Sequence, residues 1–269
     1  MLSIIVLSSD GYSDCWDPFF DLLRINFPDV EKWELILSSN HKDYDRSDLR
    51  IKTLQHGDIP WSKRLKLSLK EAKNRITLVV VEDFFLLSKV DYEVFYKLLD
   101  LISTNKEIDH IRLLYNKEKV QTETSQYQYL DKIKSRSKYR FLFLPGLWDK
   151  EVLLKYVVDF ETPFMAEKMG DYKSWVTNDG FFAVSRSYIE NNGEIFDCGT
   201  SGAIIKGKWE SWIVDRLEAY NIHIDYNIRG FKTQQTQKIS KNTIRKSMLK
   251  NPILTVRSFL NVIPLVIKK

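Results

Sequence analysis

The chain has 269 residues, of which 43% are hydrophobic and 29% are charged. These proportions are typical of a soluble globular protein, and the length is sufficient for one large domain or one domain with a tail. The formal net charge of +5 suits an anionic ligand or an anionic membrane surface. Because the basic residues are spread out and form no recognised binding motif, we expect no nucleic-acid partner.

Two cysteines, Cys15 and Cys198, are too few for a disulfide framework, and they favour a reducing compartment. The N-terminus lacks the basic segment of a signal peptide. No apolar stretch of the sequence is long enough to cross a bilayer. We therefore expect a cytoplasmic protein.

The chain opens with a predicted strand, Leu2–Leu7, whose apolar residues do not alternate with polar ones. This pattern is typical of a strand buried on both faces of a parallel sheet. The residues that follow include Ser8, Ser9, Asp10 and Tyr12. They suit a nucleotide site, because Asp10 could accept a hydrogen bond from a base or ribose and Tyr12 could stack on the base. An ordinary turn that caps the next helix is the alternative.

The next predicted elements are a helix over 17–25, strands over 33–38 and 50–54, and a helix within 56–69. Arg64 lies at the start of that second helix, where backbone amides and a guanidinium together favour an anion. A surface ion pair between Arg64 and Asp58 is the alternative.

A second strand of the buried type, Ile76–Val81, is followed directly by two acids, Glu82 and Asp83. In open α/β sheets, ligands bind beyond the carboxyl ends of such strands. Two carboxylates placed there are costly unless a cation meets them, and a divalent metal that carries a phosphate would do so. Capping of the next helix, or pairing with a lysine, is the alternative.

The second half of the chain predicts a helix over 91–102, strands over 108–114, 139–144 and 181–185, a strand-like piece at 195–198, and helices over 150–158 and 209–220. Residues 116–138 are polar and predict an excursion or a mobile loop. Trp148 follows the expected strand at 139–144, where it suits either stacking on a sugar or packing in the core.

Two lysines, Lys206 and Lys208, flank a glycine near the end of the predicted domain. Backbone and ammonium groups could therefore approach a phosphate together, although the spacing of a P-loop is absent. A surface turn is the alternative.

The composition becomes polar after Gly230: residues 232–246 are rich in Gln, Lys, Thr and Ser, which predicts a linker. Asn251-Pro252 then suits the start of a short helix. One side of that helix is apolar, with Ile253, Val256, Phe259, Leu260 and Ile263, and the other side gathers Lys246, Lys250 and Arg257. The pattern favours an amphipathic helix bound to an anionic membrane at the inner face of the cell membrane, with packing on the main domain as the alternative.

The order of these parts resembles the nucleotide-sugar glycosyltransferases of the GT-A fold, in particular bacterial enzymes of capsule and lipopolysaccharide assembly. The resemblance rests on SSDGY, a strand ending in SN, the WSKRL helix and EDFF, and by layout it extends as far as Tyr220. It implies an α/β, GT-A-like (Rossmann-like) fold with a mostly parallel central sheet flanked by helices. We expect residues 1–230 to form this domain and residues 231–269 to form the basic linker and the amphipathic C-terminal helix.

The resemblance also implies roles for the acidic pair. In that family the pair is usually Asp-x-Asp or Asp-Asp-x, and it holds the divalent metal (Mn²⁺ or Mg²⁺) that bridges the donor's diphosphate. Here Phe84 stands where a further acid would complete the strict pattern, so metal dependence is left open. If a metal binds, Asp83 is its expected ligand, and Glu82 acts through water or on the ribose.

An inverting sugar transfer needs a carboxylate to take the proton from the acceptor hydroxyl. In families similar to this chain, that base stands at the place of Glu167, with Glu161 and Asp171 as rivals. The resemblance implies a UDP-sugar donor and a lipid-linked surface-glycan acceptor, with Lys206 and Lys208 neutralising the leaving diphosphate. A retaining mechanism and a non-catalytic protein that binds a nucleotide sugar or glycan on the same scaffold are the alternatives.

Overall fold

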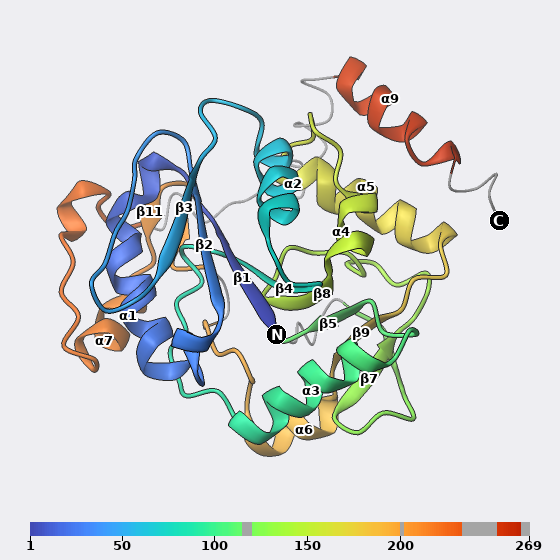
Figure 1. Cartoon of the computed structure of the whole chain (residues 1–269), viewed down its shortest axis with the longest axis horizontal. Helices are drawn as coiled ribbons and strands as arrows, with labels where there is room; N and C mark the ends of the chain where they lie inside the picture. Colours follow the sequence, from blue (N-terminus) through green and yellow to red (C-terminus); the bar gives the residue numbers. More distant parts are fainter. Residues whose placement is uncertain (115–119, 200–201, 233–251, 265–269) are drawn as a thin grey trace.

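The structure is a computed structural model that describes residues 1–114, 120–199, 202–232 and 252–264. Its centre is a nine-stranded sheet with the strand order β3-β2-β1-β4-β8-β5-β9-β7-β6. Helices flank the sheet (Figure 1), so the fold is α/β and Rossmann-like, which confirms the predicted class. No helix within these ranges is long and apolar enough to cross a bilayer.

Four parallel strands form the first half of the sheet: β3 (Ile51–Gln55), β2 (Glu34–Ser39), β1 (Leu2–Leu7) and β4 (Ile76–Val81). Every residue of β1 is buried, which explains why its sequence does not alternate. Leu7 lies opposite Val81 on one side and Ser38 on the other. The residues that follow these three strands therefore leave the sheet at one edge.

Five shorter strands of mixed direction form the second half: β8 (Gly146–Asp149), β5 (His110–Arg112), β9 (Phe181–Val184), β7 (Leu130–Ile133) and β6 (Thr122–Thr124). Because β8 runs antiparallel to β4 and β5, and β9 runs parallel to β5, both β5 and β9 point the same way as β4. The carboxyl ends of β5 and β9, and the segment that enters β8, thus lie at the same edge as the end of β4.

The helices are α1 (Trp16–Asn26), α2 (Trp61–Glu71), α3 (Tyr92–Thr104), α4 (Lys150–Tyr156), α5 (Pro163–Val176), α6 (Arg186–Asn192), α7 (Ile213–Glu218) and α9 (Pro252–Leu260). Helices α2, α4 and α5 contact one another on one side of the sheet. Helix α3 lies on the other side with α6, whose Tyr188 hydroxyl donates to Asp91 at the start of α3, 2.8 Å away.

The prediction of a strand over 139–144 is wrong. The strand at this place is β8, which begins at Gly146. The Asp171 carboxylate accepts hydrogen bonds from the backbone N–H groups of Tyr139 and Phe141, at 3.1 and 3.0 Å, so these groups are not available to a neighbouring strand. Tyr139 also has a φ of +59°, in the left-handed region that an extended strand excludes.

Two further expectations differ from the structure. The polar stretch 116–138 contains the antiparallel pair β6 and β7 at the end of the sheet. The residues of the edge strand β6 are exposed or half-buried, so a polar sequence suffices there, whereas β7 buries Leu130 and Ile133. Residues 195–198 form no strand, but Ile195, Phe196 and Cys198 are fully buried, which explains their apolar character.

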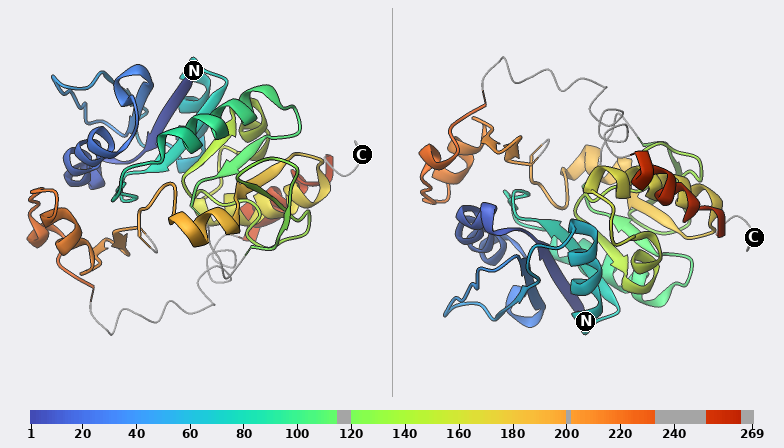
Figure 2. Two further views of the ribbon diagram at one scale, coloured as in Figure 1. Left: turned by 90° about the horizontal axis from the view of Figure 1, so that it is seen from below. Right: turned by 90° about the horizontal axis from the view of Figure 1, so that it is seen from above.

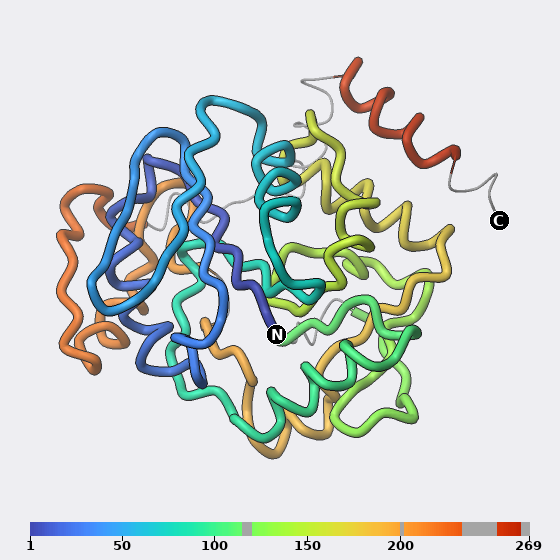
Figure 3. The backbone as a smooth tube through the Cα atoms, in the orientation of Figure 1, coloured from blue at the N-terminus to red at the C-terminus, as the bar shows by residue number. Residues whose placement is uncertain are grey.

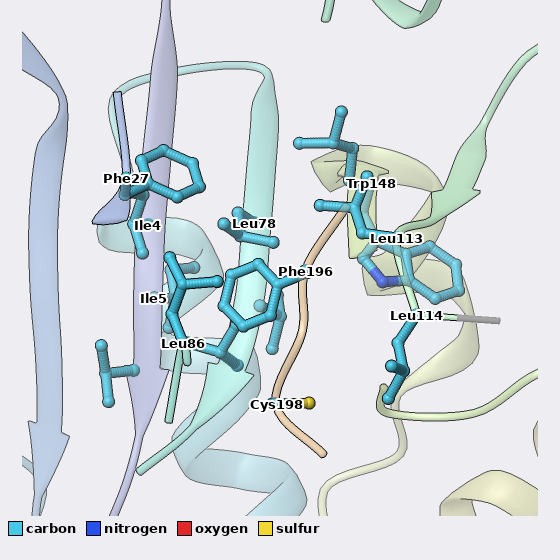
Figure 4. Packing of buried hydrophobic residues seen from close by; sticks show 14 of the residues in the cluster. Ile4, Ile5, Phe27, Leu78, Leu86, Leu113, Leu114, Trp148, Phe196 and Cys198 are labelled. Atoms are coloured by element: carbon cyan, nitrogen blue, oxygen red, sulfur yellow. The ribbon is translucent and has the colours of Figure 1, made fainter. Parts of the chain in front are cut away.

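The structure decides between the two roles considered for Trp148, which were stacking on a sugar and packing in the core. Its indole is fully buried and stacks on His110, with the ring centroids 3.6 Å apart. Figure 4 shows Trp148 among the packed apolar side chains rather than at the sheet edge. Trp148 is therefore a core residue.

The chain after β9 returns to the first half of the molecule. Trp209 stacks on Phe85, with ring centroids 6.3 Å apart, and its backbone pairs with Phe231 and Lys232. Figure 3 shows this orange segment beside the blue N-terminal part of the chain. Lys232 thus belongs to the folded body, the rest of the expected linker at 232–246 lies outside the described residues, and α9 forms where the sequence predicts a helix.

Candidate functional site

The carboxyl ends of β1 and β4 lie side by side at a switch in the topology. From β1 the chain goes to β2 and β3 on one side, and then crosses to β4 on the other side. In open α/β sheets, such a reversal leaves a crevice beyond the strand ends, where ligands bind. The candidate site is therefore built from the residues that follow Leu7 and Val81.

Glu82 and Asp83 form a turn directly after β4, and Glu82 is only 6% exposed. Burial and the neighbouring Asp83 raise the pKa of Glu82 to about 8, although the Ser8 hydroxyl and Arg64 oppose the shift. Burial likewise raises the pKa of Asp83 to about 6. Within the described residues, no lysine, arginine or histidine lies within ion-pair distance of either carboxylate. The lysine pairing considered for these acids is thus absent from the described part of the chain.

Arg64 points from α2 to the end of β1. Its guanidinium donates to the Ser8 carbonyl and, at 3.1 Å, to the Asn40 side chain that follows β2. Arg64 is only 7% exposed, and burial lowers its pKa. The alternative of a surface pair with Asp58 is wrong, because Asp58 instead accepts hydrogen bonds from Asn40 and pairs with His41.

Ser8 and Ser9 both lie at the end of β1. The Ser8 hydroxyl accepts a hydrogen bond from the Trp16 indole at 2.8 Å. The Ser9 carbonyl accepts from the backbone of Tyr12 at 2.8 Å. These contacts fix the turn that follows β1 and orient it toward Glu82.

The Asp10 carboxylate binds the backbone of the neighbouring loop instead of pointing into an open cavity. Its carboxylate accepts from the backbone N–H groups of Asn40, His41 and Lys42, at 3.0 to 3.2 Å. Burial opposes ionisation, but these donors outweigh it and lower the pKa of Asp10. Asp10 therefore remains charged and ties the end of β1 to the end of β2.

Tyr12 is covered by a residue that the sequence analysis missed. The Arg229 guanidinium lies 4.4 Å from the centre of the Tyr12 ring and donates to the Gly11 carbonyl at 2.6 Å. It also pairs with both oxygens of Asp14. No sequence motif surrounds Arg229, and only the return of the chain after α7 brings it to the site.

The segment after residue 201 closes over Asp83. The Asp83 carboxylate accepts from the backbone N–H of Ile204 at 3.3 Å, and its carbonyl accepts from Ala203 at 2.8 Å. A Cβ atom added to Gly202 would lie 2.3 Å from Asp83 Oδ2, so only glycine allows this close approach. Asp83 Oδ2 is thus engaged by the chain itself.

Lys206 and Lys208 belong to a hairpin anchored on this segment, β10 (Ile204–Ile205) and β11 (Lys208–Trp209). Lys206 and Gly207 form its two-residue turn, with φ values of +55° and +76°, as a type I′ turn requires. Lys208 donates to the Arg229 carbonyl. The surface turn considered as the alternative is present, and its strands connect directly to the residues that contact Asp83.

Glu167 lies on α5, where its carboxylate accepts from the backbone of Phe143 at 3.1 Å. Burial raises the pKa of Glu167. The β4–β8 register pairs Val79 with Gly146, so the segment that contains Phe143 runs past the end of β4. The Phe143 ring also meets Trp61 at the start of α2, with centroids 4.7 Å apart. Glu167 is therefore at the same edge as the acidic pair, beyond β8.

The two rivals of Glu167 have structural contacts. Asp171 is 5% exposed, and its two oxygens hold the backbone of Tyr139 and Phe141. Glu161 is 1% exposed, and it faces the buried Lys173 ammonium at 3.8 Å. Burial raises the pKa of both carboxyls.

The acidic pair can hold a cation only with help from a ligand. The described residues contain no group of three or more His, Cys, Asp or Glu side chains placed to hold a metal ion. A buried and a half-buried carboxyl group without a cation at ion-pair distance among the described residues nevertheless fit a hard divalent ion, because Mg²⁺ takes one or two carboxylates and completes its shell with water and phosphate. The site thus suits a phosphorylated ligand that brings its own cation.

No protein-family model and no curated protein matches the chain. Among solved structures, S. aureus TarS 1-349 is 11% identical over 68% of this chain and 60% of that chain, with a TM-score of 0.44. The same TarS segment in complex with UDP-GlcNAc is 13% identical over 98% of this chain and 81% of that chain, with a TM-score of 0.43. A cytidylyltransferase from Leptospira borgpetersenii is 10% identical over 64% of this chain and 70% of that chain, with a TM-score of 0.39.

Proposed function

We propose that this chain is a glycosyltransferase of the GT-A type. It transfers a sugar from a nucleoside diphosphate donor, with a UDP-sugar favoured, to a hydroxyl of a bacterial surface glycan. The observation that supports this most is the acidic pair at the topological switch, a buried Glu82 and a half-buried Asp83, which has no lysine, arginine or histidine within ion-pair distance in the described part of the chain. Such a pair is costly unless a ligand with its cation occupies the crevice.

The donor site in this proposal extends from β1 to β4. The nucleotide lies over the turn that follows Leu7. One wall of the site is formed by Tyr12 and by the Arg229 guanidinium, which stacks on the Tyr12 ring. Arg64 stabilises the turn through Ser8 and adds positive charge next to the acids. Glu82 meets the ribose or a bound water.

Asp83 is the proposed ligand of a divalent cation, with Oδ1 as the oxygen that Ile204 does not engage. That cation, when bound, would neutralise the diphosphate of the donor. Lys206 and Lys208, on the hairpin anchored to Asp83, add ammonium groups for the leaving diphosphate. Stabilisation of developing charge of this kind is usually the largest single contribution to catalysis.

Glu167 is the proposed base, and the proposed mechanism is inverting. Burial raises the pKa of Glu167 above its ordinary value, which makes its carboxylate a stronger base for the acceptor proton. Asp171 and Glu161 have oxygens directed to backbone N–H groups or to a buried lysine, and they are less suited to meet an acceptor. The acceptor is a lipid-linked glycan, and α9 holds the enzyme at the inner face of the membrane.

A non-catalytic protein that binds a nucleotide sugar is the second candidate, and Phe84 at the place of a further acid favours it. The two functions are separated by incubating the pure protein with UDP-sugars, Mn²⁺ and a lipid-linked acceptor. A glycosyltransferase is expected to release UDP, through transfer or slow hydrolysis, and Asp83→Asn should reduce that release. Nucleotide binding without any UDP release would support the non-catalytic function.

A further inference from the structure

Helix α9 turns its more apolar side away from the protein. Ile253, Val256 and Leu260 are 81%, 59% and 56% exposed, and their spacing of three and four residues places them on one face of α9; Ile263, just beyond the helix, is 48% exposed. The opposite face of α9 carries Leu254, Thr255 and Ser258, which are partly or fully buried. A helix that only packs on a domain would bury its apolar face, so the outward stripe needs another partner.

The helix is nevertheless fixed to the body. Ser258 of α9 is fully buried in the described structure. The Phe259 ring meets Tyr172 of α5, with centroids 5.5 Å apart. Figure 2 shows α9 (red) lying along α5 on the outside of the molecule. The apolar stripe is thus presented in a defined orientation.

A basic hollow opens beside this helix. It has a volume of about 440 Å³ and lies between α2, α4, the loop that leads into α5, and α9. Four of the side chains that line it are cationic, Lys66, Lys155, Lys173 and Arg257, and Asp159 is the one acid among them. Basic side chains therefore outnumber acidic ones among the residues that line the hollow.

The cations of this hollow are only partly neutralised. Lys66 pairs with Asp159 and Lys155 with Asp179, each at 2.8 Å, and the buried Lys173 faces Glu161 at 3.8 Å. Arg257 stacks on the Phe160 ring at 4.5 Å, and among the described residues no carboxylate lies within ion-pair distance of it. Arg257 lies four residues after Ile253 and three before Leu260 on α9, so the basic hollow and the apolar stripe share an edge. This combination of apolar and basic surfaces is typical of a helix that lies in the interface of an anionic membrane.

We propose that α9 and the basic hollow together form a binding site for anionic phospholipid. The apolar stripe enters the boundary between headgroups and acyl chains, and the hollow takes a headgroup phosphate. This inference deepens the membrane association proposed above, but it does not depend on sugar transfer. A second copy of the chain is the competing occupant of the stripe, and a soluble phosphate compound is the competing occupant of the hollow.

The test is cosedimentation of the full chain with vesicles of phosphatidylcholine alone and of phosphatidylcholine with phosphatidylglycerol, without nucleotide. We expect binding to the anionic vesicles only. Arg257→Glu should weaken it about tenfold, because each basic residue near an anionic surface contributes measurably. The double variant Val256→Asn with Leu260→Asn should weaken it at least as much. Matched controls are Arg50→Glu, an exposed arginine elsewhere, and Ile25→Asn, an apolar residue of α1 that is 41% exposed.

Equal binding of the α9 variants and the wild type would overturn the inference, and so would equal binding to neutral vesicles. Release of the protein by millimolar inorganic phosphate would identify a soluble anion as the ligand of the hollow. A concentration-dependent dimer that the Val256→Asn, Leu260→Asn variant abolishes would identify a second copy as the partner of the stripe. Unfolding temperatures and UDP binding of all variants show whether the fold and the donor site are intact, so a failure of this inference is distinct from a failure of the proposed sugar transfer.

Discussion

The two halves of the sheet place their carboxylates in different environments. In the parallel half, Glu82 is buried and Asp83 half-buried at a strand end, without a cation within ion-pair distance among the described residues. In the mixed half, Asp171 satisfies both oxygens with backbone N–H groups, and Glu167 accepts from one. The first pair therefore has carboxyl oxygens left for a ligand, whereas Asp171 stabilises the loop that contains Tyr139 and Phe141.

The halves also differ in how they are built. The parallel half uses strands of five or six residues, and Arg64, Asn40 and Asp10 hold the ends of β1 and β2 together. The mixed half uses strands of three or four residues, such as β5 and β8, joined by long segments. The donor side is thus a rigid frame, and the acceptor side depends on loops and on α5. This contrast predicts that variants in the two halves fail in different ways.

The largest expected effect is on catalysis in the mixed half. Glu167→Gln should reduce transfer by about 10²–10⁴-fold and leave UDP binding nearly unchanged, because the amide keeps the size of the side chain but cannot take the proton. Initial rates of transfer and calorimetric UDP binding check this. Glu161→Gln and Asp171→Asn are the matched controls, which should keep most of the activity. If one of these controls is the inactive variant, Glu167 is not the base, and if all three stay active a retaining mechanism is favoured.

The next effect concerns the pH dependence of stability in the parallel half. Because the pKa of Glu82 is about 8 in the folded state and its ordinary value is 4.5, the folded state binds more protons than the unfolded state in this window. The free energy of unfolding of the ligand-free protein should therefore fall as the pH rises from about 5 to 8. Glu82→Gln should remove most of this fall and be more stable than wild type at pH 8 by about 2–4 kcal/mol, since each pKa unit corresponds to about 1.4 kcal/mol.

Urea unfolding of both proteins at several pH values checks this prediction. The difference should vanish near pH 4, where the carboxyl is protonated in both states. A wild-type protein whose stability rises over the same window would mean that Glu82 is ionised and has a cationic partner. The acidic pair would then be a structural feature rather than a binding site.

A smaller effect is expected where a carboxylate holds the backbone. Asp10→Ala should destabilise the fold by about 1–3 kcal/mol, because the N–H groups of Asn40, His41 and Lys42 lose their acceptor. Thermal unfolding checks this, with the exposed Asp45→Ala as the control. UDP binding should weaken as well, since the ends of β1 and β2 would separate. Unchanged UDP affinity in a destabilised Asp10→Ala protein would place the nucleotide away from this turn.

The sequence predicted the parallel half well, because its signals are local. The unbroken apolar runs of β1 and β4 require burial on both faces of the sheet. Because ligands of open α/β sheets bind beyond the carboxyl ends of such strands, the polar residues that follow β1 and β4 could be assigned to the site. Arg229 could not be predicted, since its contact with Tyr12 and Asp14 depends on the path of the chain after α7. The strand expected at 139–144 failed for a similar reason: Asp171, far away in sequence, takes the N–H groups that a strand would use.

The central claim is that the ends of β1 and β4 bind a nucleoside diphosphate with a divalent cation. Calorimetric titration of UDP, with and without Mn²⁺, tests it most directly on the wild type, on Asp83→Asn and on Asp100→Asn, which changes an exposed carboxylate of α3. We predict binding that Mn²⁺ strengthens in the wild type and in Asp100→Asn, and a loss of that strengthening in Asp83→Asn, with a smaller loss in Glu82→Gln. If neither UDP nor another nucleoside diphosphate binds at millimolar concentration with Mn²⁺ present, the claim is contradicted.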